Sequence, residues 1–165
     1  TPEYALSDAA KWTRGAEHDA AHGLGFHFLA FEQLSGELIG VCSVTEKAKA
    51  YGEDRVWNLG YWIRALSEGR GFASEATASV INAARQSDRI DQLEIKMLAN
   101  NDGSQRVAIK SGAQFIGVRD GDISLHGKKW PAFIYRLSVT NASSSIQGTL
   151  SARSLKAAKS FDNAC

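Results

Sequence analysis

The sequence predicts a mixed α/β domain built around one mixed β-sheet. Short β-branched and aromatic runs recur along residues 25–139, amphipathic helical stretches interrupt them, and a strand–helix–strand unit stands in the middle. The 165 residues suffice for one domain with its own core. We assign that domain to residues 1–140. Residues 141–165, which are rich in Ser and Ala, are expected to form a C-terminal extension or tail.

The first half of the chain predicts one helix and then three strands. Ser7 and Asp8 are typical of a helix N-terminus, and the polar run that follows to about Ala21 is typical of a surface helix. A Ser-Gly-Glu turn separates two apolar runs and predicts a hairpin, and a β-branched and aromatic run follows it. The three strands are expected at 25–34, 38–46 and 56–66.

The second half predicts a helix, a strand, a second helix and a hairpin. The first of these helices, from about Phe72 to Gln86, carries an apolar stripe of small and β-branched residues. The second ends at Gly112, because glycine favours the position after a helix C-terminus. The strand is expected at 91–99, the second helix at 102–110, and the hairpin strands at 113–125 and 130–139.

Composition and charge exclude several classes of partner. The net charge of +1 gives no overall field that would attract nucleic acid or a membrane surface. The two cysteines form no disulfide framework and suit a reducing cytosol. No apolar run approaches the ~20 residues of a membrane-spanning helix, and no signal peptide opens the chain. We therefore expect a cytoplasmic monomer or homodimer with no nucleic-acid or membrane partner.

A glycine-containing stretch, ALSEGRGFASEA at 65–76, stands where a helix is expected to begin. Gly69 and Gly71 allow positive φ and close approach of a ligand to the backbone. Their N–H groups and those opening the helix predict an anion site for a pyrophosphate, to which Arg70 adds charge. The alternative is a plain strand-to-helix turn. There is no P-loop motif, and Ser74 replaces the third glycine of the dinucleotide fingerprint.

A second stretch, NNDGSQRVAIKSGAQFIG at 100–117, opens the next helix. Ser104 lies in the first turn of that helix, where its hydroxyl can face the strand ends. The alternative is structural: Asn101 or Asp102 caps the helix, and Ser104 is an ordinary polar position.

Together, these two stretches resemble the GNAT acetyltransferase family, in particular its RimJ/RimL-like branch. The resemblance runs from about Phe26 to Leu137, with both motifs in the family's order and spacing. It implies a GNAT-like fold with two splayed central strands and acetyl-CoA as acetyl donor. Relatives usually carry a strand before this region, whereas residues 1–24 here predict only an atypical N-terminal helix.

The resemblance also implies which residues hold the donor. The family's pyrophosphate loop falls on Glu68, Gly69, Arg70, Gly71, Phe72 and Ala73, followed by Ser74. The strand before it would pair with the pantetheine arm through Trp62, Ile63 and Arg64, where a backbone N–H would polarise the thioester carbonyl. Asn101 and Ser104 match an Asn-x-x-Ser pattern that faces the pantetheine and the sulfur.

The implied reaction is direct attack of a primary amine, on a protein N-terminus or a small molecule, on the acetyl thioester. Many relatives have a tyrosine proton donor where this chain has Ala108, which leaves a hydrogen bond from Ser104 to the departing thiolate. Many also have a glutamate where this chain has Asn58, which would orient a water or the acceptor. Glu94 on the neighbouring strand is a candidate base; the alternative is an exposed strand carboxylate.

Some features favour other interpretations. Glu68 stands where relatives have Gln or Arg, and its charge beside a pyrophosphate is unfavourable unless it points to solvent. His18 and His22 have a metal-ligand spacing, but no third ligand is evident, so we expect a solvated helix face and no metal. The alternatives to an enzyme are a degenerate GNAT-fold module that binds acyl-CoA without catalysis and an unrelated nucleotide-binding module.

Overall fold

The computed structural model describes residues 6–47 and 55–140. Its helices are α1 (Leu6–Ala21), α2 (Phe72–Ala84) and α3 (Asp102–Lys110), with a 3-10 turn at Ala65–Ser67. Its strands are β1 (Gly25–Phe31), β2 (Leu38–Glu46), β3 (Val56–Ile63), β4 (Gln92–Leu98), β5 (Gln114–Leu125) and β6 (Lys128–Ser138). The predicted mixed α/β fold, with a helix and no strand among the described residues ahead of Gly25, is confirmed.

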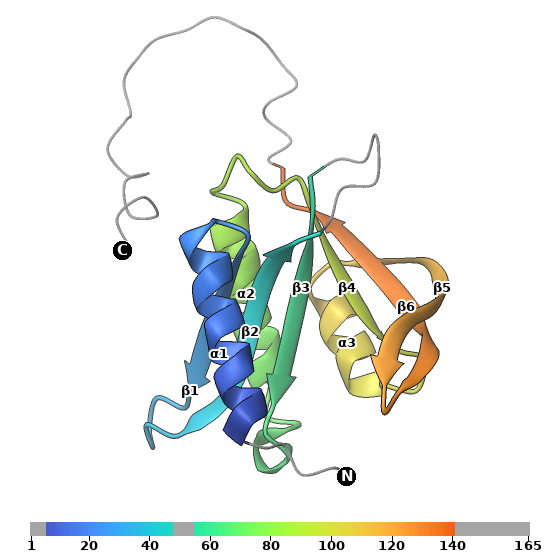
Figure 1. Cartoon of the computed structure of the whole chain (residues 1–165). Coiled ribbons are helices and arrows are strands. Elements are labelled where there is room, and N and C mark those ends of the chain that lie inside the picture. The colour runs from blue at the N-terminus through green and yellow to red at the C-terminus, as the bar shows by residue number, and fades with distance from the viewer. Residues whose placement is uncertain (1–5, 48–54, 141–165) are drawn as a thin grey trace, which may run out of the picture.

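The strands form one mixed sheet in the order β1-β2-β3-β4-β6-β5. All neighbours are antiparallel except β3 and β4, which are joined through α2 as a parallel pair. Helices α2 and α3 lie behind the sheet and α1 lies in front of it, over β1 and β2 (Figure 1). The sheet therefore has two faces, a core face toward α2 and α3 and an α1 face.

The core lies between the sheet and α2 and α3. Alternate residues of β4 point into it, and Leu93, Ile95 and Met97 are almost fully buried. They pack against the apolar stripe of α2, Val80 and Ile81 included, and against Ala108 of α3. Residues between them on β4 must therefore face the α1 side of the sheet.

Strands β3 and β4 separate after a short stretch of pairing. Their only register partners are Val56 with Gln92, Trp57 with Leu93 and Asn58 with Glu94. Beyond this point, β3 continues along β2 and β4 continues along β6. The splayed central pair is thus confirmed, and a gap opens in the sheet just before the glycine loop.

Several boundaries differ from the predicted ones. The first strand ends at Phe31, because a turn closed by the Glu32 N–H donating to the Glu37 carbonyl replaces its expected last residues. The third strand ends at Ile63 and gives way to the 3-10 turn, and α2 ends at Ala84. The tail at 141–165 lies outside the described residues, so the domain boundary at 140 stays a prediction. No described helix is long and apolar enough to cross a membrane.

Candidate functional site

The loop between β3 and α2 presents bare backbone at the start of a helix. Gly69 and Gly71 have φ values of 74° and 89°, and a Cβ at either position would meet no atom within 4 Å. Gly71 is the N-cap residue of α2 and provides no side-chain hydrogen bond to the first turn. The first-turn N–H groups, Phe72 to Ser74, have no acceptor within the helix. This geometry fits an anion bound by backbone N–H groups.

These N–H groups face a cavity of about 420 Å³ between the loop, the end of β3 and the first turns of α3. It brings together most of the predicted donor-binding residues: Trp62, Ile63, Glu68, Gly69, Gly71, Phe72, Ala73, Ser74, Asn101 and Ser104. Two motifs that are far apart in the sequence therefore line one cavity, at the mouth of the gap between β3 and β4.

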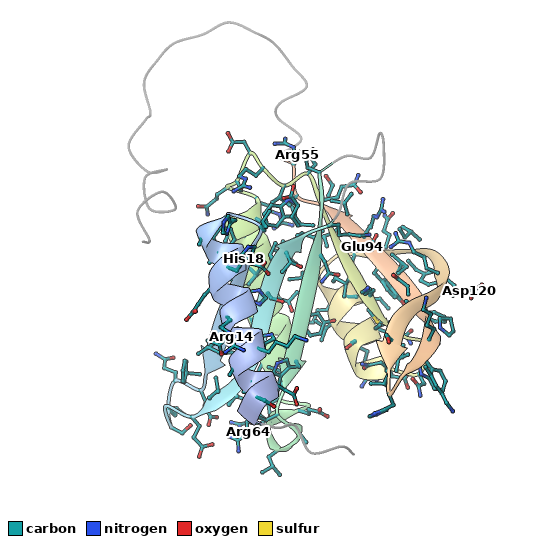
Figure 2. The ribbon with its side chains drawn as sticks, in the orientation of Figure 1. Arg14, His18, Arg55, Arg64, Glu94 and Asp120 are labelled. Carbon is teal, nitrogen blue, oxygen red and sulfur yellow. The ribbon has the colours of Figure 1, made fainter. Side chains whose placement is uncertain are left out.

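Two predicted residues direct their side chains elsewhere. The Arg70 guanidinium forms an ion pair with Glu32 and lies 4.7 Å from the Phe72 ring centroid, so it does not supply the expected charge to the cavity. The Arg64 backbone N–H donates to the Ile39 carbonyl, and its guanidinium donates to the Leu38 carbonyl. Arg64 is labelled in Figure 2. Arg70 can therefore contribute to an anion site only through its backbone N–H.

Positive charge reaches the cavity instead from α3. Arg106 and Lys110 are four residues apart, on one helix face, and both line the cavity. Neither takes part in an ion pair with another described residue. Sequence reasoning missed them because exposed basic residues on a helix are ordinary; the available signal was their i, i+4 spacing in the helix whose first turn contains Ser104. They, and not Arg70, offset the exposed Glu68 carboxylate at the same cavity.

Two hydrogen bonds fix the first turn of α3: one caps the helix and the other joins it to β3. The Asn101 Oδ1 accepts from the Ser104 N–H at 3.0 Å, so the capping role considered for Asn101 is confirmed. The Tyr61 hydroxyl donates to the Ser104 carbonyl at 3.0 Å, and burial raises the pKa of Tyr61 to about 12. Tyr61 thereby links β3 to α3 across the gap. The half-buried Ser104 side chain lines the cavity.

Asn58 and Glu94 lie opposite each other at the last paired position of β3 and β4. Glu94 is fully buried, so the alternative of an exposed strand carboxylate is wrong. Lys47 donates to it at 2.6 Å, Arg136 at 3.0 Å, and Arg119 through two nitrogens at 2.6 and 2.7 Å. Burial raises the pKa of Glu94, but these hydrogen bonds outweigh it and hold the pKa at about 2. A carboxylate with so low a pKa is a poor proton acceptor at neutral pH.

The part of the chain that the structure describes has no cluster of three or more His, Cys, Asp and Glu side chains that could hold a metal ion. The rings of His18 and His22 stack on the surface of α1, with centroids 4.2 Å apart.

Comparison with known proteins identifies the family of this chain. Residues 1–114 match the model of the acetyltransferase (GNAT) domain. A ribosomal-protein-serine acetyltransferase of Escherichia coli is 25% identical over 138 residues, which cover 77% of this chain and 74% of that protein.

Solved structures share the fold at about 20% identity. The Mycobacterium smegmatis RimJ in complex with a CoA-disulfide superposes with a TM-score of 0.70, covering 87% of this chain and 66% of that one. The microcin C7 self-immunity acetyltransferase in complex with acetyl-CoA and AMP also gives 0.70, covering 81% and 72%. With the family model matching most of the chain, this protein belongs to the GNAT acetyltransferases.

Proposed function

We propose that this chain transfers an acetyl group from acetyl-CoA to a primary amine, on a protein N-terminus or a small molecule. The observation that carries the proposal is the cavity, where the bare N–H groups of the Gly69–Gly71 loop meet two basic residues of α3 beside a gap in the sheet. The relatives named above support it: two bind CoA or acetyl-CoA, and one is named for acetylating a ribosomal-protein serine.

The cavity suits a long, thin molecule with a charged end. The N–H groups from Gly69 to Ser74 would bind the pyrophosphate, and Arg106 and Lys110 would bind further phosphate charge. The pantetheine arm would lie along Trp62 and Ile63, where β3 has lost β4 as a hydrogen-bonding neighbour.

In the reaction, a bond forms between the amine nitrogen and the acetyl carbon, and the carbon–sulfur bond breaks. The amine must first lose a proton, since an alkyl ammonium has a pKa of about 10, and the departing thiolate belongs to a thiol with a pKa of about 8.5. Ser104 would donate a hydrogen bond to the thiolate. Asn58 would orient the acceptor or a water that carries the amine proton to solvent.

Glu94 has a different part in this proposal. Its low pKa and its three cationic partners favour a positioning residue over a base. It would hold β4 and β6 in place beside Asn58.

A second function, acyl-CoA binding without turnover, is favoured by one observation. Ala108, at the position where many relatives carry a tyrosine donor, is fully buried in the core and has no proton to donate. Calorimetric titration with acetyl-CoA, with NAD as control, tests acetyl-CoA binding, which both functions require. Thiol release over a panel of amines then separates the two: release identifies an enzyme, and binding alone identifies a binding module.

A further inference from the structure

The cationic side chains around Glu94 carry more positive charge than its single carboxylate neutralises. Lys47, Arg119 and Arg136 contact Glu94, and Lys96 and Arg119 share the carboxylate of Asp122 at 3.5 and 3.7 Å. We call this set the cationic wall. Its four cations face two carboxylates, which leaves a net charge of +2. The neighbouring Asp120 points away from it, toward solvent (Figure 2).

The cationic wall lies on the α1 face of the sheet, at the point where the gap opens. Glu94 stands between Leu93 and Ile95, which point into the core, so its side chain points to the other face. Asn58 stands between the buried Trp57 and Leu59 and shares that face. Because Asn58 and Glu94 are the last register partners, the wall borders the opening between β3 and β4.

Beside the wall, two neighbouring positions on the α1 face of the sheet, Gly60 and Ser43, have small side chains. Gly60 follows Asn58 on this face and is paired with Ser43 of β2. A Cβ at Gly60 would stand 3.2 Å from the Ser43 Oγ, so a larger residue would crowd this position. An amine that approached the gap from this face would pass Gly60 and Ser43, with the cationic wall on one side.

The wall retains unused hydrogen-bond donors. The side chains of Lys47 and Arg136 are 28% and 23% exposed, although Glu94 between them is not exposed at all. Arg136 contacts Glu94 through Nε alone, and no described residue accepts from its two Nη atoms. Lys47 uses one of three ammonium donors on Glu94. A carboxylate at the surface could therefore bind both without displacing Glu94.

We propose that the cationic wall binds a carboxylate of the acceptor, so that the enzyme prefers amines with an acidic group close by. This rests on the proposed acetyl transfer. The carboxylate has two possible sources, an acidic side chain next to a peptide N-terminus or the α-carboxylate of a small amino acid. The same positive charge disfavours the ammonium form of the amine, which helps a site with Asn58 in place of a glutamate.

Thiol release from acetyl-CoA by the full chain tests this with matched acceptors. One pair is a peptide with Ser-Asp at its N-terminus and the same peptide with Ser-Asn; the other is a free amino acid and its amide. We expect kcat/KM to be at least about fivefold higher for the acidic member of one pair. The pair that shows the difference identifies the source of the carboxylate, a side chain or an α-carboxylate. This preference should fall as salt screens the exposed charges.

Three variants exclude mere structural damage. Lys47→Gln should lower the acidic-to-neutral ratio of kcat/KM, and Glu94→Gln, which removes a negative charge, should raise it. Lys128→Gln, at the far end of β6, should leave the ratio unchanged. Damage to the fold would lower the rates for acidic and neutral acceptors alike and leave the ratio between them unchanged.

Two results overturn the inference in distinguishable ways. If neutral acceptors turn over as well as acidic ones in both pairs, the inference is wrong and the acetyl transfer stands. If acetyl-CoA binds and no acceptor of either pair, nor any amine of the wider panel, releases thiol, the proposed transfer is wrong and the inference falls with it.

Discussion

Replacing Gly71 by tryptophan should abolish acetyl-CoA binding and leave the fold intact. At φ 89°, any L-residue is strained by about 1–2 kcal/mol, which a domain with 5–15 kcal/mol of stability tolerates. The new side chain would fill space that the structure leaves open beside the first turn of α2. Two lost hydrogen bonds from N–H groups to phosphate, at about 1.5–3 kcal/mol each, weaken binding at least about 100-fold.

The control is the same change at Gly127, in the turn between β5 and β6. Its φ is 72° and its Cβ would also meet nothing within 4 Å, so the strain is matched while the cavity stays open. Calorimetric titration measures the affinity of both variants, and thermal unfolding measures the strain. Binding by Gly71→Trp within about threefold of the wild type would refute the loop assignment. An equal loss in Gly127→Trp would mean that strain, and not occupancy, is the cause.

Three further changes test other parts of the site. Ser104→Ala should lower kcat at least about tenfold with little change in acetyl-CoA affinity, because its hydroxyl is assigned to the thiolate; an unchanged kcat would remove that role. Arg106→Gln with Lys110→Gln should weaken acetyl-CoA by about tenfold or more and weaken CoA without its 3′-phosphate less, by calorimetry. Glu94 has a lowered pKa, so its stabilisation is present above its unfolded value of about 4.5 and is lost as pH falls toward 2. Acid unfolding of Glu94→Gln should therefore be less pH-dependent in that window, and an unchanged profile would contradict the ion pairs.

The parts of the fold and site that could be predicted depend on local sequence. The bounds of β2 and α3 follow from alternation and capping within a few residues, and both agree with the structure. The glycine loop was readable because positive φ and a helix start are encoded in adjacent residues. The separation of β3 and β4 could not be predicted from periodicity, because the side-chain alternation of a strand does not show where its pairing with a neighbour ends. It was predicted from the resemblance to a family.

What could not be predicted depends on contacts between distant residues. Glu94 alternates with apolar neighbours as an exposed strand residue does, and only the approach of Lys47, Arg119 and Arg136 allows it to be buried. Arg70 was expected at the anion because it lies between the two glycines. Glu32, which is 38 positions earlier in the chain, takes its guanidinium instead.

The position of Glu94 links the fold of the sheet to its chemistry. Backbone pairing between the β1–β2–β3 half and the β4–β6–β5 half stops at Asn58 and Glu94, where the gap between β3 and β4 opens. Lys47, which follows β2, reaches Glu94 of β4 and so joins the two halves where the hydrogen-bond ladder ends. Arg55 and Asp91 form an ion pair at 2.9 Å that joins the two halves at the other end of the paired stretch. A buried carboxylate with three cations is a costly arrangement, and removing one partner costs about 3–5 kcal/mol. Here it has a use that an apolar contact could not have, since it closes the sheet at the apex of the gap and leaves positive charge on the face where the amine would enter.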